Sequence, residues 1–124
     1  KSDSQSLIRD KVIAYHADEV FVFVNKKDIT TKIDTISLEV ARFGLENTLN
    51  ALDCFGSAKL RINNKPVKSL GQNYIVDLNL HKRYSYDDLE FRVKEIPGVL
   101  ETGLFVNLAD KVYAVDKNKI TKCD

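Results

Sequence analysis

The side chains best suited to metal or nucleophilic chemistry are two cysteines and two histidines, and their spacing supports neither. Cys54 and Cys123 form no Cys-x-x-Cys motif and no zinc-binding spacing. Sequence alone places neither His16 nor His81 beside a thiol, so nothing marks a cysteine as a nucleophile. A disulfide is open, but two free thiols in a reducing cytoplasm are the favoured interpretation. No metal site is predicted.

Charged side chains are numerous, and their balance limits the partners that the protein attracts. There are 19 basic and 18 acidic side chains, for a net charge of +1. Such a balance produces no field that would draw the protein to nucleic acid or to an anionic membrane surface. The longest purely apolar run, residues 20–24, is far too short to span a bilayer. We therefore expect neither nucleic acid nor a membrane as a partner.

Length and composition are typical of an ordinary folded protein. The 124 residues correspond to one domain, or to a domain plus part of another. The sequence is 44% hydrophobic and 30% charged, so it can bury a real core. It contains no methionine, which predicts that the natural start is missing.

The two ends of the sequence have the pattern of a layered α/β sheet. Residues 7–17 are predicted as a helix, because apolar side chains recur there at helical spacing. Residues 20–24 form a continuous β-branched and aromatic run, which is typical of a strand covered on both faces. Residues 111–115 are predicted as a strand that pairs with residues 20–24 or with missing sequence, and residues 120–122 pair back. The apolar stripe of the helix is assigned to Ile8, Val12 and Tyr15.

The middle of the sequence follows a different pattern, that of a half-exposed sheet with amphipathic helices. Leu45, Leu49 and Leu52 mark one helix, and Ser85 caps a second, with Asp88 in a capping-box position. With the intervening strands, the order is strand, helix, strand, strand, helix, strand. This is the split βαβ, or ferredoxin-like (βαββαβ), arrangement, an antiparallel sheet that carries both helices on one face. The strands are predicted at residues 37–41, 58–62, 74–80 and 99–106.

Four stretches carry a resemblance to a known family, the type A ribose-5-phosphate isomerases. The most specific is the run Ile96 to Val106 with Ala109 to Val112, which resembles the family's C-terminal signature. The resemblance covers nearly the whole sequence and needs few gaps. The other three stretches are Asn73 to Leu78, Leu38-Glu39-Val40 with Phe43-Gly44, and Leu7, Arg9 and Lys11 to Ala14.

This resemblance implies a fold and a domain organisation. In the family, a Rossmann-like main domain is interrupted by a ferredoxin-like small domain, and the last strand returns to the main sheet. The fold class is therefore α/β with α+β, and the chain corresponds to the family's C-terminal part. Residues 1–35 and 108–124 would be a remnant of the main domain, and residues 36–107 the small domain.

The resemblance also implies a reaction, the interconversion of ribose 5-phosphate and ribulose 5-phosphate through an enediolate. The family's catalytic glutamate falls on Asp10, which could equally be a solvated charge near a helix start. Its first substrate-binding lysine falls on Lys1, a terminal residue. Its second falls on Lys27 after a one-residue shift, where an ordinary loop lysine is the alternative. The family's glycine run falls on residues 2–4, which are Ser-Asp-Ser.

Other parts of the family's site have no counterpart in this sequence. The Thr/Ser/Gly phosphate loop and two aspartates would precede Lys1, and the five glycines form no substitute cradle. The resemblance implies no cofactor, a small phosphosugar substrate, a cytoplasmic location and a homo-oligomer, either dimer or tetramer. Two alternatives remain open. One is a non-catalytic sugar-phosphate-binding or assembly module on the same scaffold, and the other is an unrelated ferredoxin-like regulatory domain.

Overall fold

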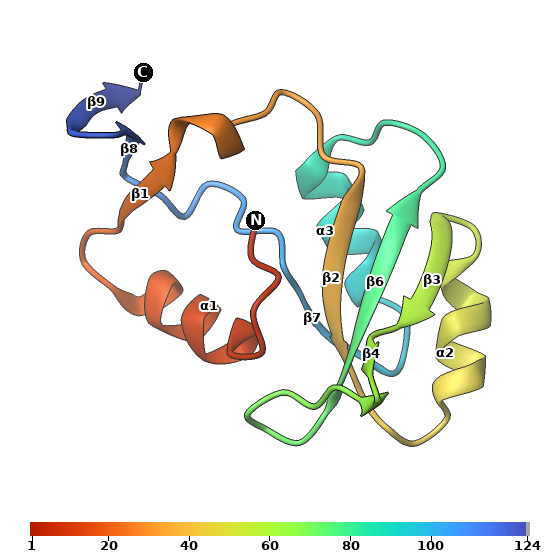
Figure 1. Cartoon of the computed structure of the whole chain (residues 1–124). Helices are drawn as coiled ribbons and strands as arrows, with labels where there is room; N and C mark the ends of the chain where they lie inside the picture. The colour runs from red at the N-terminus through yellow and green to blue at the C-terminus, as the bar shows by residue number, and fades with distance from the viewer. Residues whose placement is uncertain (124) are drawn as a thin grey trace.

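The strands of the chain form separate sheets in the computed structural model, which describes residues 1–123 (Figure 1). The helices are α1 (Leu7–His16), α2 (Leu45–Leu52), α3 (Tyr86–Lys94) and the 3₁₀ helix η1 (Lys26–Asp28). The strands are β1 (Phe21–Asn25), β2 (Thr35–Val40), β3 (Gly56–Leu60), β4 (Ile62–Asn63), β5 (Lys65–Pro66), β6 (Tyr74–Leu80), β7 (Val99–Thr102), β8 (Lys111–Asp116) and β9 (Lys119–Cys123). The protein is thus a mixed α/β structure, as expected.

The larger sheet is antiparallel and contains four strands in the order β3-β6-β2-β7. Its elements follow one another as strand, helix, strand, strand, helix, strand, which is the predicted order. β6 has the predicted bounds, because its apolar and polar residues alternate with the period of a strand. Strands β4 and β5 form a small separate hairpin between β3 and β6.

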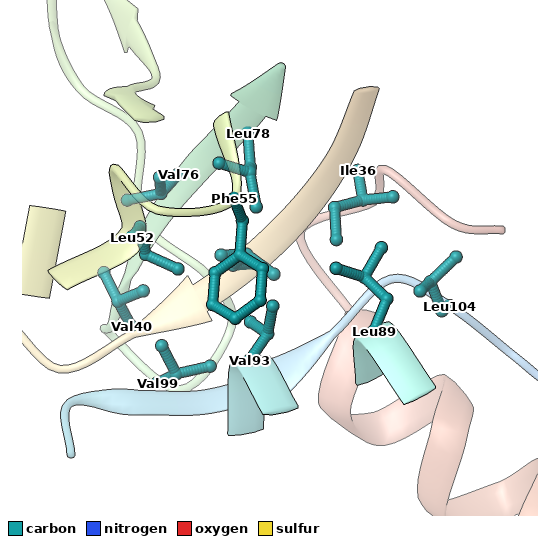
Figure 2. Packing of buried hydrophobic residues seen from close by; sticks show 11 residues of the cluster. Ile36, Val40, Leu52, Phe55, Val76, Leu78, Leu89, Val93, Val99 and Leu104 are labelled. Atoms are coloured by element: carbon teal, nitrogen blue, oxygen red, sulfur yellow. The ribbon is translucent and has the colours of Figure 1, made fainter. Parts of the chain in front are cut away.

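One face of this sheet packs against both α2 and α3 and forms the main core (Figure 2). Ile36, Leu38 and Val40 lie on this face because alternate residues of a strand point to the same side. Leu52 from α2 and Leu89 from α3 meet them. Each such side chain contributes about 1.5–3 kcal/mol when it is fully buried. This core fixes the sheet that the remaining elements pack against.

The opposite face of the sheet is polar yet buried. Ser37 and Glu39 of β2 point to this side, and both are almost inaccessible to solvent. Residues 1–6 and α1 cover them, with Leu7 completely buried. The amide of Ser2 donates to the carbonyl of Gly103 over 2.7 Å, which joins this segment to the end of β7. The chain's first residues are therefore part of the packed structure.

The smaller sheet contains β1, β8 and β9. β1 and β8 are parallel, and β9 pairs back onto β8, so the predicted pairings of these strands are confirmed. The prediction that β1 is covered on both faces is wrong for the described residues. Phe23 is 61% exposed, and its ring stacks on Tyr113 of β8. The reason is that β1 forms an edge of this sheet and no layer of residues 1–123 encloses it.

The predicted apolar stripe of α1 is also wrong. Leu7 and Lys11 are the buried residues of this helix, whereas Tyr15 is 70% exposed and Val12 about half exposed. Residues four apart share one face of a helix, so Leu7 and Lys11 turn together toward the sheet. The buried ammonium group of Lys11 is stabilised there by ion pairs with Glu90 and Glu101.

Two further local predictions need correction. The strand expected to reach residue 106 ends at Thr102. A β-carbon on Gly103 would lie 2.0 Å from the carbonyl oxygen of Ser2, so the chain packs too closely here for any other residue. Ser85 precedes α3, but its hydroxyl bonds the carboxylate of Asp87 and makes no capping bond to the backbone.

No helix within residues 1–123 is long and apolar enough to cross a bilayer.

Gly56 and Gly44 provide a test of this packing. A β-carbon on Gly56 would lie 1.9 Å from the backbone oxygen of Asn79 in β6, whereas one on Gly44 meets nothing within 4 Å. We expect Gly56→Ala to lower the free energy of unfolding by about 3 kcal/mol or more, because two paired strands must separate. Gly44→Ala should cost only about 1–2 kcal/mol, since its φ of 70° is the sole penalty. Urea unfolding measures both, and equal losses would contradict the strand pairing.

Candidate functional site

Asp10 lies near the start of α1, and neighbouring hydroxyl groups hold its carboxylate on one side. Its Oδ2 accepts hydrogen bonds from Ser6 Oγ at 2.9 Å and from Ser4 Oγ at 3.5 Å. The two serine hydroxyls also bond to each other at 2.6 Å. Its Oδ1 accepts no hydrogen bond from residues 1–123. The carboxylate is therefore oriented through one oxygen, and the other is available to a ligand.

A shallow groove between α1 and the start of β1 adjoins this carboxylate. Asp10 and Glu19 line it together with apolar side chains, among them Ile13 and Phe21. None of the described residues that line the groove is a cation. Two carboxylates without a compensating cation repel a phosphate group. The groove alone thus suits proton transfer better than phosphate binding.

The two predicted lysines lie in different surroundings. Lys1 reaches the start of β2, where its Nζ donates to the carbonyl of Thr35 at 2.6 Å. Lys27 lies in η1, which follows β1, and its side chain is exposed. Within residues 1–123, no hydrogen bond or ion pair joins Asp10, Lys1 and Lys27 to one another. Asp10 and Lys1 lie on the continuous stretch of residues 1–16, whereas Lys27 lies beyond β1 on the connection to β2.

Residues 2–4, which occupy the position of the family's glycine run, have ordinary backbone conformations. The residues with positive φ are found elsewhere among residues 1–123, and neither Ser2, Asp3 nor Ser4 is one of them. A positive φ would impose a steric penalty on these side chains, and none is present. The Ser-Asp-Ser sequence is therefore compatible with this backbone, although Asp3 brings a negative charge to a position where the family has glycine.

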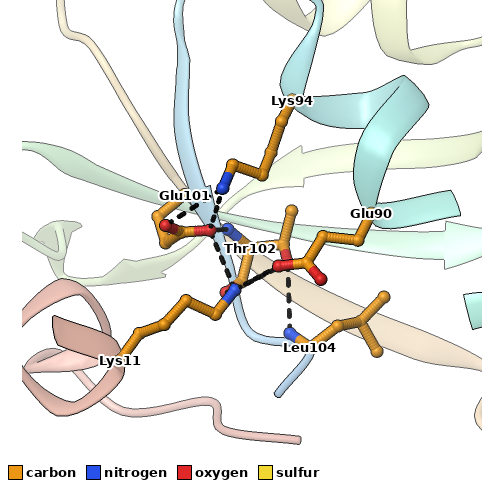
Figure 3. A network of polar contacts seen from close by, with 6 residues as sticks. All are labelled: Lys11, Glu90, Lys94, Glu101, Thr102 and Leu104. Atoms are coloured by element: carbon orange, nitrogen blue, oxygen red, sulfur yellow. Dashed lines mark hydrogen bonds and ion pairs between the residues drawn. The ribbon is translucent and has the colours of Figure 1, made fainter. Parts of the chain in front are cut away.

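The network around Lys11 is a feature that sequence reasoning missed (Figure 3). Lys11 is only 8% exposed, and its Nζ contacts Glu90 Oε1 at 2.5 Å and Glu101 Oε1 at 2.8 Å. It also donates to the carbonyl of Thr102 at 2.8 Å, while Lys94 approaches Glu101 from the other side at 3.1 Å. The one signal in the sequence is Glu101 itself, a charged residue in an apolar strand.

Burial and charge act in opposite directions on Glu101. Burial of its side chain raises the pKa of the carboxyl, because the charged form loses water. The hydrogen bond from Lys11, the bond from the Thr102 amide and the positive charge of Lys11 outweigh this effect. The pKa of Glu101 is therefore lowered from its ordinary value of 4.5. The ion pair between Lys11 and Glu101 joins α1 to β7.

Glu39 is a second buried carboxylate, on the face of β2 that residues 1–6 cover. It is 2% exposed and has no cation as hydrogen-bond partner among the described residues. Its Oε2 accepts hydrogen bonds from Ser69 Oγ at 2.7 Å and from Asn73 Nδ2 at 2.8 Å. These two donors belong to the loop before β6. That loop in turn holds Gln5, because the Leu70 amide donates to the Gln5 carbonyl.

The cysteines and acidic groups show no sign of metal chemistry in the part of the chain that is described. Cys54 and Cys123 are free thiols, as the sequence favoured. Within residues 1–123, no group of three or more His, Cys, Asp or Glu side chains is arranged to hold a metal ion.

Comparison with solved structures defines the class of protein first. The fold matches that of sugar-phosphate isomerases. The enzyme from Methanocaldococcus jannaschii is 27% identical with a TM-score of 0.86, and the match covers 94% of this chain and 54% of that one. A ribose-5-phosphate isomerase solved in complex with phospho-erythronic acid is 26% identical, also with a TM-score of 0.86, over 95% of this chain and 55% of that one.

The particular family follows from the sequence comparison. The family model for ribose 5-phosphate isomerase A (phosphoriboisomerase A) matches residues 1–119, so the chain belongs to this family. "Ribose-5-phosphate isomerase A" from Picrophilus torridus is 33% identical over 116 residues, which are 91% of this chain and 52% of the relative. "Ribose-5-phosphate isomerase A 2" from Oceanobacillus iheyensis is 31% identical, over 98% and 56% respectively. The chain spans about half the length of these relatives.

Lys11 and Lys94 allow a matched test of the buried network. Lys11→Met should lower the free energy of unfolding by about 3–5 kcal/mol near neutral pH, because Glu90 and Glu101 would remain close together without their buried cation. Lys94→Met removes a more exposed cation from the same carboxylate and should cost at most about 1 kcal/mol. Chemical denaturation measures both, and similar losses would contradict a special role for Lys11.

The same pair of variants makes a prediction about pH. In the unmodified protein, the stability that Glu101 contributes is fully present above pH 4.5, the ordinary pKa of a glutamate. It is lost as pH falls through the lowered pKa of Glu101 in the folded state. In Lys11→Met, burial and the nearby Glu90 are opposed only by Lys94 and the Thr102 amide, so the pKa of Glu101 should rise above its ordinary value. Stability of this variant should then increase as pH falls from 7 to 5, while the unmodified protein changes little. Denaturation midpoints across this range provide the measurement, and parallel curves would refute the assignment.

Proposed function

We propose that this chain is part of an aldose–ketose isomerase that interconverts ribose 5-phosphate and ribulose 5-phosphate, with Asp10 as the general base. The observation that carries the proposal is the carboxylate of Asp10. One of its oxygens is oriented by Ser4 and Ser6, and the other has no hydrogen-bond partner among residues 1–123. Membership of the ribose 5-phosphate isomerase A family supports the same substrate class.

The proposed reaction needs one base and a stabilised oxyanion. Asp10 takes the proton from C2 of the open-chain aldose, which leaves an enediolate with its negative charge on the oxygen at C1. The hydroxyl proton at O2 passes to O1, and Asp10 returns its proton to C1 to give the ketose. Lys1 and Lys27 are proposed to bind the substrate, where their charges would favour the anionic intermediate. No step requires a metal or an organic cofactor.

An aspartate in place of the family's glutamate changes the reach of the base. The aspartate side chain is one methylene shorter, and a displacement of about an ångström can cost about a hundredfold in rate. The serine hydroxyls partly compensate, because they hold the carboxylate in one orientation. We therefore expect a working but slowed base.

Phosphate binding is proposed to depend on sequence beyond this chain. The groove beside Asp10 has no cation among its described lining residues, and the chain spans about half the length of its relatives. In this proposal, residues 1–35 and 108–124 belong to a Rossmann-like domain that the family's phosphate loop completes. The open edge of β1 supports this division, because an unpaired edge accepts further strands. Residues 36–107, with the strand order β3-β6-β2-β7, form the ferredoxin-like domain.

The setting of the enzyme is part of the same proposal. Free thiols at Cys54 and Cys123 are compatible with a reducing cytoplasm. The exposed side chains of β1 and the family's expected association favour a homo-oligomer, dimer or tetramer. Size-exclusion chromatography with light scattering tests this assembly directly.

A non-catalytic role for the same scaffold is favoured by two observations. Asp3 brings a negative charge where the family has glycine, close to the position proposed for an anionic sugar. Lys1 Nζ is already engaged by the carbonyl of Thr35. In this second function, the protein binds a sugar phosphate or assembles with other chains but does not convert the sugar.

Substitution of Asp10 tests the proposed function. The assay uses the longest protein that the gene encodes. In this protein, Asp10→Asn should lower kcat for ketose formation from ribose 5-phosphate by about 10²–10⁴-fold, since the base is lost. Asp10→Glu should retain activity or raise it, because it restores the longer reach. Asp53→Asn changes an aspartate at the end of α2, far from α1 in sequence, and serves as the control with unchanged rate.

The outcome of this experiment also separates the two functions. Turnover that survives Asp10→Asn would refute the assignment of the base. A folded protein without turnover that still binds phospho-erythronic acid in calorimetry would establish the binding function instead. Absence of both would refute both proposals.

A further inference from the structure

The guanidinium group of Arg61 joins three parts of the structure. Arg61 directly follows β3, and its Nε donates to Asp77 Oδ2 at 2.9 Å, while its Nη2 donates to Asp77 Oδ1 at 2.5 Å. Nη2 also donates to Ser37 Oγ at 2.9 Å. The remaining nitrogen, Nη1, donates to the backbone carbonyl of Asp3 at 2.7 Å. Two nitrogens of the guanidinium group are thus bonded to β6 and β2, and the third, Nη1, binds the segment before α1.

We propose that Arg61, locked by Asp77, is a positioning residue that holds residues 1–6 so that Asp10 and Lys1 face the substrate. This inference rests on the proposed function, because it assigns a task to a residue outside the reacting groups. A bidentate arginine–carboxylate pair has a defined geometry, so its third donor is aimed at one place.

The contact reaches the base through two short steps. Asp3 is followed directly by Ser4, whose hydroxyl bonds Ser6 Oγ and Asp10 Oδ2. Displacement of the Asp3 carbonyl would therefore shift the hydroxyl that orients the carboxylate. Lys1 lies two residues before Asp3 and would move with it. A small displacement of a base has a large effect on rate, so a remote residue can control this site.

Arg61 also explains how the segment is held without glycine. It binds a backbone carbonyl, and this contact is indifferent to the side chain at residue 3. Its positive charge lies near Asp3, whose carboxylate would otherwise face an anionic substrate unopposed. Asp77 remains charged beside it, because the hydrogen bond from Arg61 lowers the pKa of that carboxyl despite partial burial.

The alternative is that Arg61 only ties β3, β6 and β2 together. Its bonds to Asp77 and Ser37 would then stabilise the sheet as a whole, and the Asp3 contact would be incidental. The two roles predict that substitution of Arg61 affects different parts of the structure. A positioning role loosens residues 1–6 selectively, whereas a sheet-stabilising role loosens the whole protein.

Amide hydrogen exchange distinguishes these roles in the chain as it is. The amides of Ser2 and Leu70 report on the segment, because they bond Gly103 and Gln5 respectively, and the amide of Leu78 in β6 reports on the sheet. In Arg61→Ala and Arg61→Lys, exchange at Ser2 and Leu70 should be about tenfold faster, since one charge-assisted hydrogen bond is lost. Exchange at Leu78 should change less than twofold.

The conservative variant and a matched control sharpen the test. Arg61→Lys keeps a charge beside Asp77 but lacks the planar fork, so it should not restore protection of the segment. Arg92→Ala removes an arginine of α3 that pairs with Asp88 and should leave residues 1–6 unchanged. Full rescue by lysine, or equal acceleration at Ser2, Leu70 and Leu78, would overturn the proposal.

Activity provides the second readout. In the active gene product, Arg61→Lys should lower kcat for ketose formation about tenfold, because the base is misaligned after the substrate has bound. If the unmodified protein has no isomerase activity, the proposed function fails while the exchange result still decides the role of Arg61. If exchange is uniform and activity is intact in Arg61→Lys, the inference fails while the function stands.

Discussion

The polar face of the four-stranded sheet is the constraint on which the arrangement of the site depends. A buried polar group costs free energy unless it is hydrogen-bonded, and a buried charge costs more unless it is paired. Glu39 and Ser37 are both buried on this side, so the segment that covers them must leave room for their specific partners. Among the described residues, no buried side-chain nitrogen or oxygen lacks a hydrogen-bond partner. A cover that slid along the sheet would break several of these bonds at once.

This constraint also sets the rotation of α1. Lys11 is drawn inward by Glu90 and Glu101, and Leu7 packs one turn before it on the same side. Successive residues of an α-helix differ by about 100° around its axis. With Lys11 fixed against the sheet, Asp10 must face a different direction, along the groove toward β1. The direction of the candidate base is thus decided by the neighbouring lysine.

Sequence reasoning predicted those features whose causes are local. β6 alternates apolar and polar residues over its whole length, and α2 repeats leucine at helical spacing, so both could be located from the sequence. It failed where the partner is distant in the sequence. Nothing near Lys11 reveals that Glu90 and Glu101 will enclose it, so Val12 and Tyr15 were assigned to the buried face. Strand β7 ends early for a similar reason, because Gly103 must pass the backbone of Ser2.

The candidate site shows the same division between local and distant causes. Asp10 could be proposed from the resemblance of α1 to the family, but its serine partners and Arg61 could not, since they follow from the folding of residues 1–6 onto the sheet. The segment is held on the side of the four-stranded sheet, where Arg61 and Leu70 donate hydrogen bonds to its backbone carbonyls. On the other side, β1 presents exposed aromatic rings and an open edge. The four-stranded sheet therefore supports Asp10 on one side, and this chain determines its orientation. The pocket proposed for the substrate, in contrast, is not enclosed by the described residues on the side toward β1, because β1 is an open edge.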